Sequence, residues 1–231
     1  MAQTPEINQT FLREVDDNLR RDRLRDFARK NGKWLIVALV LFLVASGGFI
    51  WWQQHRQQQS EQQVEQLVDA YRTLGTGKSA EATKQLVPLA DSGSKAIRAS
   101  AIFASAVTAI ERGDTKTAIA KFSTVAADNS LPQPYRDLAL IRQTALEFDQ
   151  IKPDQVVSRL EPLAKPDSPW FGTAGEMTAL AFIKQGKKGE AGQLFAAIAK
   201  DKKVPDSTRE RAIQIASSLG VDASSALPQP Q

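Results

Sequence analysis

Residues 34–52 read WLIVALVLFLVASGGFIWW, nineteen consecutive positions without a charged side chain. At a rise of about 1.5 Å per residue, a helix of this length spans roughly 28 Å, close to the thickness of the hydrocarbon core of a bilayer. Backbone groups in lipid must hydrogen-bond within the segment, so we expect the helix to continue through Gly47 and Gly48. Indole rings favour the headgroup level, and tryptophans stand at both ends of the segment. These are Trp34, Trp51 and Trp52.

The charges on either side of this segment predict the orientation of one transmembrane helix. Residues 19–33 hold seven Lys or Arg, whereas residues 53–67 hold only Arg56. Because positively charged flanks stay in the cytoplasm, we expect residues 1–33 there and residues 53–231 across the membrane. In a bacterial inner-membrane protein the C-terminal part is then periplasmic, and the lack of cysteine is compatible with that oxidising space. A cleavable signal peptide is the alternative, but the preceding region and the apolar run are both longer than such a peptide has.

The composition restricts the function of the remaining chain. Of 231 residues, 42% are hydrophobic and 24% are charged, which is typical of a globular protein, and the net charge of +4 gives little support for nucleic-acid binding. The absence of cysteine and the single histidine exclude cysteine nucleophiles, thiolate metal sites and histidine-based metal clusters. The phosphate-loop, dinucleotide-binding and H-E-x-x-H motifs do not occur. We therefore expect no catalytic, cofactor-binding or metal-binding residues and no small-molecule substrate.

After the membrane segment, the sequence reads as short amphipathic helices that end at Gly, Pro or clusters of Asp, Asn and Ser. No stretch alternates with period two for long enough to predict a strand. We expect an all-α domain over residues 60–220, preceded by a Gln-rich helical connector at 53–66, with a break allowed near Gln53 to Gln59. A flexible tail follows at 221–231. The expected helices are 60–75, 79–91, 94–112, 115–128, 134–149, 153–165, 169–185, 188–201 and 205–219.

Four parts of this domain repeat one pattern. The anchor positions Ala82, Ala118, Val156 and Ala191 are separated by 36, 38 and 35 residues. Four residues after the anchors stand Leu86, Phe122, Leu160 and Phe195, and seven after them Leu89, Val125, Leu163 and Ile198. Twelve residues before them stand Ala70, Ala106, Thr144 and Ala179, and turn glycines occur at Gly77, Gly113 and Gly186. The pattern resembles the tetratricopeptide repeat, which implies an α-solenoid of about four helical hairpins plus a capping helix.

A stack of helical hairpins offers an extended inner face, formed mainly by the first helix of each pair, on which peptides or other proteins bind. Each apolar residue of that face can instead belong to the core, so they support a partner-binding groove only as a group. The residues predicted to line the groove are Leu67, Tyr71, Phe103, Val107, Ile141, Phe148, Glu176 and Leu180.

The order of features resembles the YfgM family. The resemblance rests on the juxtamembrane string FARKNGK at 27–33, the membrane helix ending in Trp51-Trp52-Gln53, and the degenerate repeats. It implies an ancillary subunit of the SecYEG translocon, anchored in the bacterial inner membrane with its repeat domain in the periplasm. It also implies association with a membrane-anchored chaperone of the PpiD type that assists emerging proteins, and it implies no catalytic residues.

We therefore expect a single-pass adaptor that binds protein partners next to the lipid bilayer. Anchoring raises the effective concentration of the domain, so a weak groove suffices. The predicted residues of the membrane anchor and of contact with another membrane helix are Trp34, Gly47, Gly48, Trp51 and Trp52. Two alternatives stay open: a self-associating scaffold for cell-wall or outer-membrane assembly, and an envelope enzyme with an unrecognised active site.

Overall fold

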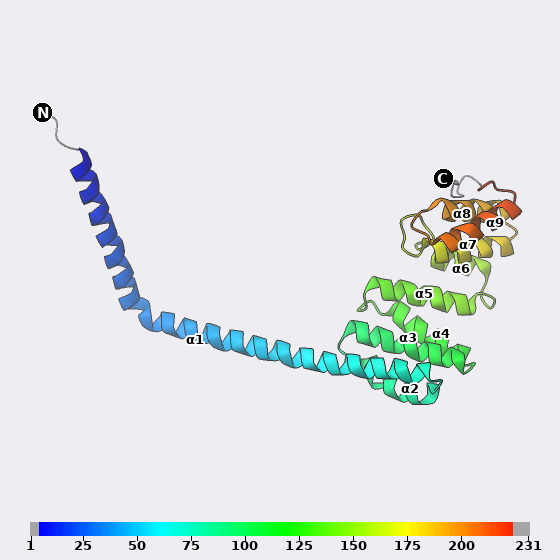
Figure 1. The fold of residues 1–231 in the computed structure, drawn as a ribbon, viewed down its shortest axis with the longest axis horizontal. Coiled ribbons are helices and arrows are strands. Elements are labelled where there is room, and N and C mark those ends of the chain that lie inside the picture. Colours follow the sequence, from blue (N-terminus) through cyan, green and yellow to red (C-terminus); the bar gives the residue numbers. More distant parts are fainter. Residues whose placement is uncertain (1–4, 224–231) are drawn as a thin grey trace. The chain divides into compact units, whose positions relative to one another are not determined.

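The computed structural model describes residues 5–223, and for residues 5–32, Leu35 and Arg56 it describes the backbone alone. It divides into two compact units, Met1–Glu61 and Gln62–Gln231. All secondary structure of the described residues is helical, which confirms the all-α prediction (Figure 1). The elements are α1 (Pro5–Gly75), α2 (Ser79–Leu86), the 3-10 helix η1 (Pro88–Asp91), α3 (Lys95–Glu111), α4 (Thr115–Ala127), α5 (Gln133–Glu147), α6 (Pro153–Leu160), α7 (Phe171–Lys184), α8 (Lys188–Lys200) and α9 (Asp206–Ser218).

The first unit consists of α1 up to Glu61. The helix continues through the apolar segment 34–52 and through the Gln-rich connector without the break allowed near Gln53 to Gln59. No Gly or Pro occurs between Gly48 and Gly75, and Gln has a good helix propensity, so nothing in the sequence interrupts the hydrogen-bond ladder. One helix of the described chain is long and apolar enough to cross a membrane. Of the predicted cytoplasmic segment, residues 1–4 and the side chains before Lys33 lie outside the described part.

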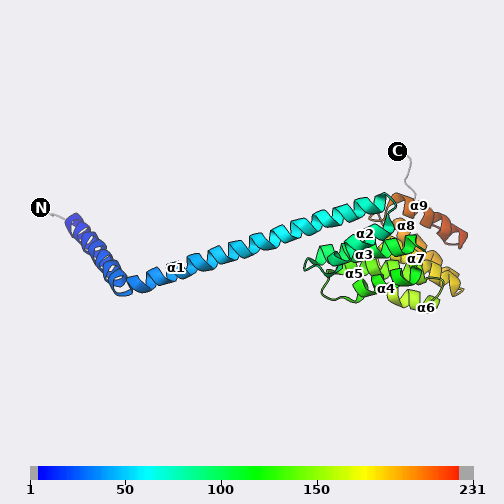
Figure 2. The same cartoon turned by 90° about the horizontal axis from the view of Figure 1, so that it is seen from below.

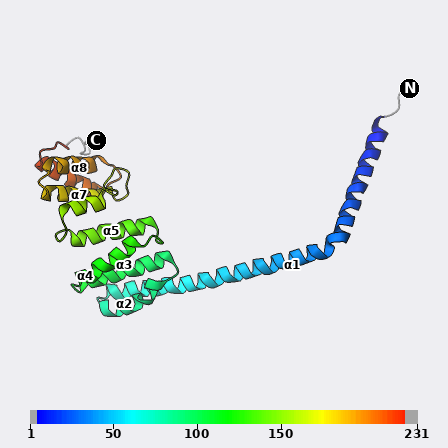
Figure 3. The same cartoon turned by 180° about the vertical axis from the view of Figure 1, so that it is seen from behind.

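The second unit is a stack of four helical hairpins and a capping helix, as the sequence predicts. The last turns of α1 share a buried cluster with α2 and η1. The next three hairpins are α3 with α4, α5 with α6, and α7 with α8. In each pair we name the two helices the first and the second helix. The capping helix α9 packs against α8 and α7. Figure 2 shows this unit from below, and Figure 3 shows its hairpins following one another in chain order.

The repeat register predicts the core of this unit correctly. The anchor position, the positions four and seven residues after it and the position twelve residues before it are buried in all four hairpins, with no side chain more than 7% exposed. Small residues at the first-helix position, such as Ala70 and Ala106, are 0% exposed because the two helices of a hairpin cross there. Bulky residues of the second helix, such as Phe122 and Phe195, fill the space between hairpins.

The turns inside the hairpins follow the glycine pattern. Gly77, Gly113 and Gly186 have φ angles of 77°, 76° and 79°, a left-handed conformation that glycine adopts without steric penalty. The third hairpin has no glycine at this place. Its turn is formed differently, because the N–H groups of Gln150 and Ile151 both donate to the carbonyl of Glu147, at 2.8 and 3.0 Å.

Prolines shorten two of the second helices relative to the expected spans. Pro88 and Pro162 both stand six residues after the anchor of their hairpin. The expected helix 79–91 is therefore divided into α2 and η1, and the expected helix 153–165 ends at Leu160. Proline has no N–H to donate and its ring clashes with the preceding turn. The second helices α4 and α8 lack this proline and extend to Ala127 and Lys200.

The start of the predicted tail packs against the end of the stack. Ala223 is 0% exposed, and Val221 lies on α8 over Gly192, where an added Cβ atom would lie 2.6 Å from Val221 Cγ2. Glycine at this position therefore lets the chain cross α8 closely. Residues 224–231 of the predicted tail lie outside the described residues.

Candidate partner-binding surface

An exposed apolar position directly follows the buried small residue of every first helix. A step of one residue turns an α-helix by about 100°, so the side chain after the helix crossing points out of the hairpin. Tyr71, Val107 and Leu180 are 46%, 45% and 41% exposed at this position, and the third hairpin has the exposed Ala145 there. We call Tyr71, Val107, Ala145 and Leu180 the first-helix row. Three of its members belong to the predicted groove.

Four other residues of the predicted groove pack mainly inside the hairpins. Leu67 contacts the buried cluster of the first hairpin, and Phe103 lies edge-on to the ring of Phe122 with centroids 5.4 Å apart. Ile141 is 3% exposed, and Phe148 is partly buried against the same cluster. These side chains position the first helices, and they offer less surface to a partner than the row does.

Glu176, the predicted charged residue of the groove, is bound to the capping helix. Its two carboxylate oxygens accept hydrogen bonds from Arg211 Nε and Nη2 at 2.6 and 2.9 Å. The hydrogen bond and the charge of Glu176 raise the pKa of Arg211. This bidentate pair joins α7 to α9 and occupies the carboxylate.

Tyr71 connects the first helices of the first and second hairpins. The Tyr71 hydroxyl donates to the carbonyl oxygen of Ser100 on α3 at 3.4 Å. Burial raises the pKa of Tyr71, and an electrostatic interaction with Tyr135 of α5 raises it further. The Tyr71 side chain therefore reaches the backbone of α3 on the face that carries the row.

The residues predicted to anchor the chain in the membrane lie on α1 in the first unit. Trp34, Trp51 and Trp52 are 75%, 69% and 49% exposed. A Cβ atom added at Gly47 or Gly48 would meet no other atom within 4 Å. The helix surface at these two glycines is therefore not covered by any side chain. Trp51 stacks on the His55 ring at 5.8 Å between centroids, just beyond the apolar segment.

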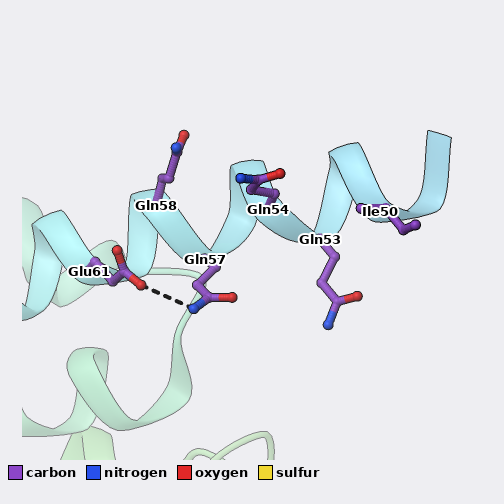
Figure 4. Close-up of a pocket in the computed structure, with 6 residues that line it drawn as sticks. All are labelled: Ile50, Gln53, Gln54, Gln57, Gln58 and Glu61. Carbon is purple, nitrogen blue, oxygen red and sulfur yellow. Dashed lines mark hydrogen bonds between the residues drawn. The ribbon is translucent and has the colours of Figure 1, made fainter. Parts of the chain in front are cut away.

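The Gln-rich connector has a hollow of about 380 Å³ on one side of the helix (Figure 4). The residues that line it are Ile50, Gln53, Gln54, Gln57, Gln58 and Glu61. Gln57 Nε2 donates to Glu61 Oε1 at 3.1 Å along the helix. The hollow is formed by one helix and is open to its surroundings, so it does not enclose a ligand as a cofactor site does. Within residues 33–223, no group of three or more His, Asp or Glu is placed to hold a metal ion.

The sequence comparisons agree with this architecture. A family model described as a tetratricopeptide repeat-like domain matches residues 25–216. The chain belongs to this family. The family includes YfgM-like proteins, and the match begins before the apolar segment. No curated protein and no solved structure matches the chain.

In this tetratricopeptide repeat-like domain, most charges near the row are already paired. Glu147 accepts from Arg159 and, at 3.2 Å, from Gln143. Asp149 pairs with Lys184 at 2.5 Å, and the Lys184 ammonium also lies 4.5 Å from the centroid of the Phe148 ring. These contacts hold α5 to α6 and to α7.

Several residues of this face were not predicted from the sequence. Arg142 is exposed on α5, and its side chain forms no ion pair and no hydrogen bond with any described residue. Tyr135 and Ala145 also belong to this face, and Ile110 is 40% exposed one turn beyond Val107. The repeat register contains the information needed to find Arg142 and Ala145, because each stands at a fixed offset from the buried residue Thr144.

Proposed function

We propose that the chain is a membrane-anchored adaptor whose repeat domain lies in the periplasm and binds proteins. In this proposal it is an accessory component of the SecYEG translocon and works with a PpiD-type chaperone on proteins that emerge from the membrane. The first-helix row is the observation that carries the proposal, because it places one exposed, uncharged side chain on each hairpin. Membership of a repeat family whose stacked hairpins bind proteins supports the same function.

The row alone provides weak binding. Full burial of a Val or Leu side chain contributes about 1.5–3 kcal/mol, so a half-exposed one gains about 1–1.5 kcal/mol when a partner covers it. Tyr71, Val107 and Leu180 together then supply about 3–5 kcal/mol, less than the roughly 8 kcal/mol of a micromolar complex. Anchoring in the membrane of the partner compensates for this by raising the effective concentration. The proposal thus depends on both the row and the apolar segment, and it assigns no catalytic step to the chain.

Site-specific photocrosslinking in intact cells tests the row. The full chain would carry a photoreactive amino acid at Val107 or Leu180, and as a control at Gln193, an exposed residue of the second helix α8. We expect translocon or chaperone adducts from the two row positions and none from the control. Adducts only with other copies of the chain would instead support a self-associating scaffold.

Crosslinking from Gly47 tests the predicted contact with another membrane helix. We expect an adduct with a translocon or chaperone component. Capture of lipid alone would mean that the membrane helix anchors the chain but does not contact a partner.

A reporter fused after Gln231 tests the orientation. We expect a reporter that is active only in the periplasm to be active there. A cytosolic reporter would contradict the proposal, because the row would then lie on the wrong side of the membrane.

A further inference from the structure

The third hairpin departs from the others at two positions of the same face. Two residues before the buried small residue, the other first helices have uncharged side chains, whereas α5 has the exposed Arg142. The other residues at this offset are Val68, Ala104 and Met177. In the row itself α5 has Ala145, smaller than its equivalents. The row therefore has a gap at the third hairpin, and a cation stands beside it.

Arg142 lies on the face that carries the row. Residues three and seven positions apart share one side of a helix, so Arg142 lies on the same side of α5 as Ala145 and Tyr135. Tyr135 interacts electrostatically with Tyr71, which is itself a member of the row. The guanidinium group thus lies on the side of α5 that carries Ala145, the row position of the third hairpin.

No carboxylate of the neighbouring elements neutralises Arg142. Glu147 is paired with Arg159, and Asp149 with Lys184. Glu176 is held by Arg211. The guanidinium group is always charged and presents a planar fork of donors that matches a carboxylate. Among the described residues of α5, α6 and α7 it has no such partner.

We infer that the segment bound by the row is mainly apolar and carries one Asp or Glu side chain, which pairs with Arg142 over Ala145. The inference rests on the proposed function and specifies the chemistry of its partner. α5 packs directly against α7, and packed helices lie about 8–10 Å apart, roughly the span of three residues of extended chain at about 3.3 Å each. The bound segment is therefore an extended peptide with apolar residues about three positions before and after the acidic one. These apolar residues lie over Val107 and Leu180.

The test uses two labelled synthetic peptides and the full chain in detergent micelles. The peptides differ only in their central residue, which is Asp in one and Asn in the other. Both have a leucine three positions before and three positions after this residue. Fluorescence anisotropy measures their affinities. A charge-assisted bidentate hydrogen bond is worth more than a neutral one, so we expect the wild-type chain to bind the Asp peptide roughly ten-fold more tightly.

Substitutions of Arg142 give the decisive comparison. In the Arg142→Gln variant we expect the preference for Asp to disappear while the affinity for the Asn peptide is retained. Arg142→Lys should keep part of the preference, because an ammonium group has the charge without the fork. Lys116→Gln, which removes an exposed cation of α4, is the matched control and should keep the full preference. Unchanged far-UV circular dichroism confirms that each variant is folded.

Two results separate this inference from the proposed function. Equal affinity of the wild-type chain for both peptides, or an unchanged Asp preference in Arg142→Gln, would overturn the role of Arg142 and leave the apolar row in place. The Val107→Glu variant tests the row, and we expect it to bind both peptides more weakly than the wild-type chain does. If the variant and the wild-type chain bind the peptides with equal affinity, the row is not the binding surface and the proposed function is contradicted. Failure of the wild-type chain to bind either peptide even at about millimolar concentration, the affinity to which about 3–5 kcal/mol corresponds, would also contradict it.

Discussion

The apolar segment 34–52 and the first-helix row both expose apolar side chains, but they distribute them differently. In α1 the closely spaced residues Ile36, Val37, Leu39 and Val40 are 64%, 48%, 57% and 52% exposed, so apolar atoms surround the helix. In the repeat unit only one side of each first helix is exposed and apolar. A helix that is apolar all round requires an apolar solvent, whereas a single stripe requires one partner. The distribution of exposed area, more than its amount, indicates what covers it.

Introducing charged side chains should give the largest difference between the two regions. An arginine near the centre of a membrane helix costs about 2.5–3.5 kcal/mol, so we expect the double variant Val40→Arg, Leu43→Arg to lose about 5–7 kcal/mol of insertion free energy. Fractionation with alkaline extraction should move the chain from the membrane pellet to the soluble fraction. Val107→Arg, the same change in the row, should leave it in the pellet. Retention of the double variant in the membrane would contradict a lipid-covered segment.

Truncating one core residue and one row residue sharpens the distinction inside the repeat unit. Phe195 is 0% exposed, and Phe195→Ala should destabilise the unit by about 3–5 kcal/mol because it leaves a cavity between α8 and its neighbours. Leu180→Ala removes a side chain that is 41% exposed and should cost about 1 kcal/mol or less. Thermal unfolding of the detergent-solubilised chain, followed by circular dichroism, measures both. A similar loss in the two variants would place Leu180 in the core.

The repeat positions could be predicted from the sequence because their burial depends on spacing within one hairpin. Ala82 and Leu86 are buried for the same local reason as Ala191 and Phe195. The shortening of α2 and α6 was not predicted, although Pro88 and Pro162 occupy one register position. The predicted groove placed Ile141, which is 3% exposed, together with Val107, which is 45% exposed. These residues stand three positions before and one position after the buried small residue of their helices, so the register could have separated them.

The candidate surface was predictable only in part, because some of its features depend on more than one hairpin. Tyr71, Val107 and Leu180 share an offset and belong to the groove predicted from the sequence. The electrostatic interaction of Tyr135 with Tyr71 links the first and third hairpins, so no local pattern contains it. The isolation of Arg142 depends on which acidic groups are already paired, and the pairing of Glu147 with Arg159 spans two helices.

Glycine substitutions distinguish the two regions by the space around their backbones. Gly192→Ala forces a Cβ atom against Val221, which should cost about 1–3 kcal/mol of unfolding free energy. Gly189→Ala, three residues earlier on α8, meets no atom within 4 Å and should stabilise the unit by about 0.5–1 kcal/mol. Gly47→Ala in the apolar segment should leave the unfolding temperature of the repeat unit unchanged. Equal behaviour of Gly192→Ala and Gly189→Ala would show that Val221 does not pack on α8.

Acid gives the smallest expected difference between the regions. The apolar segment contains no carboxylate, whereas Asp114 caps α4 and accepts from the Thr117 backbone N–H at 3.1 Å. Hydrogen bonds from Thr117 lower the pKa of Asp114 below its usual 3.8. The stabilisation from this cap is therefore complete above that value and is lost as the pH falls through the lowered pKa.

We expect the unfolding temperature of the repeat unit to fall below about pH 4, while membrane insertion stays unchanged. Asp114→Asn keeps a good cap without a titrating group and should flatten part of this pH dependence. Parallel curves for the variant and the wild-type chain would show that Asp114 does not contribute to it. Asp114 begins the second helix of the hairpin that carries Val107. Such a result would therefore attribute the acid sensitivity of that hairpin to its other carboxylates. One of them is Asp128, whose pKa is also lowered.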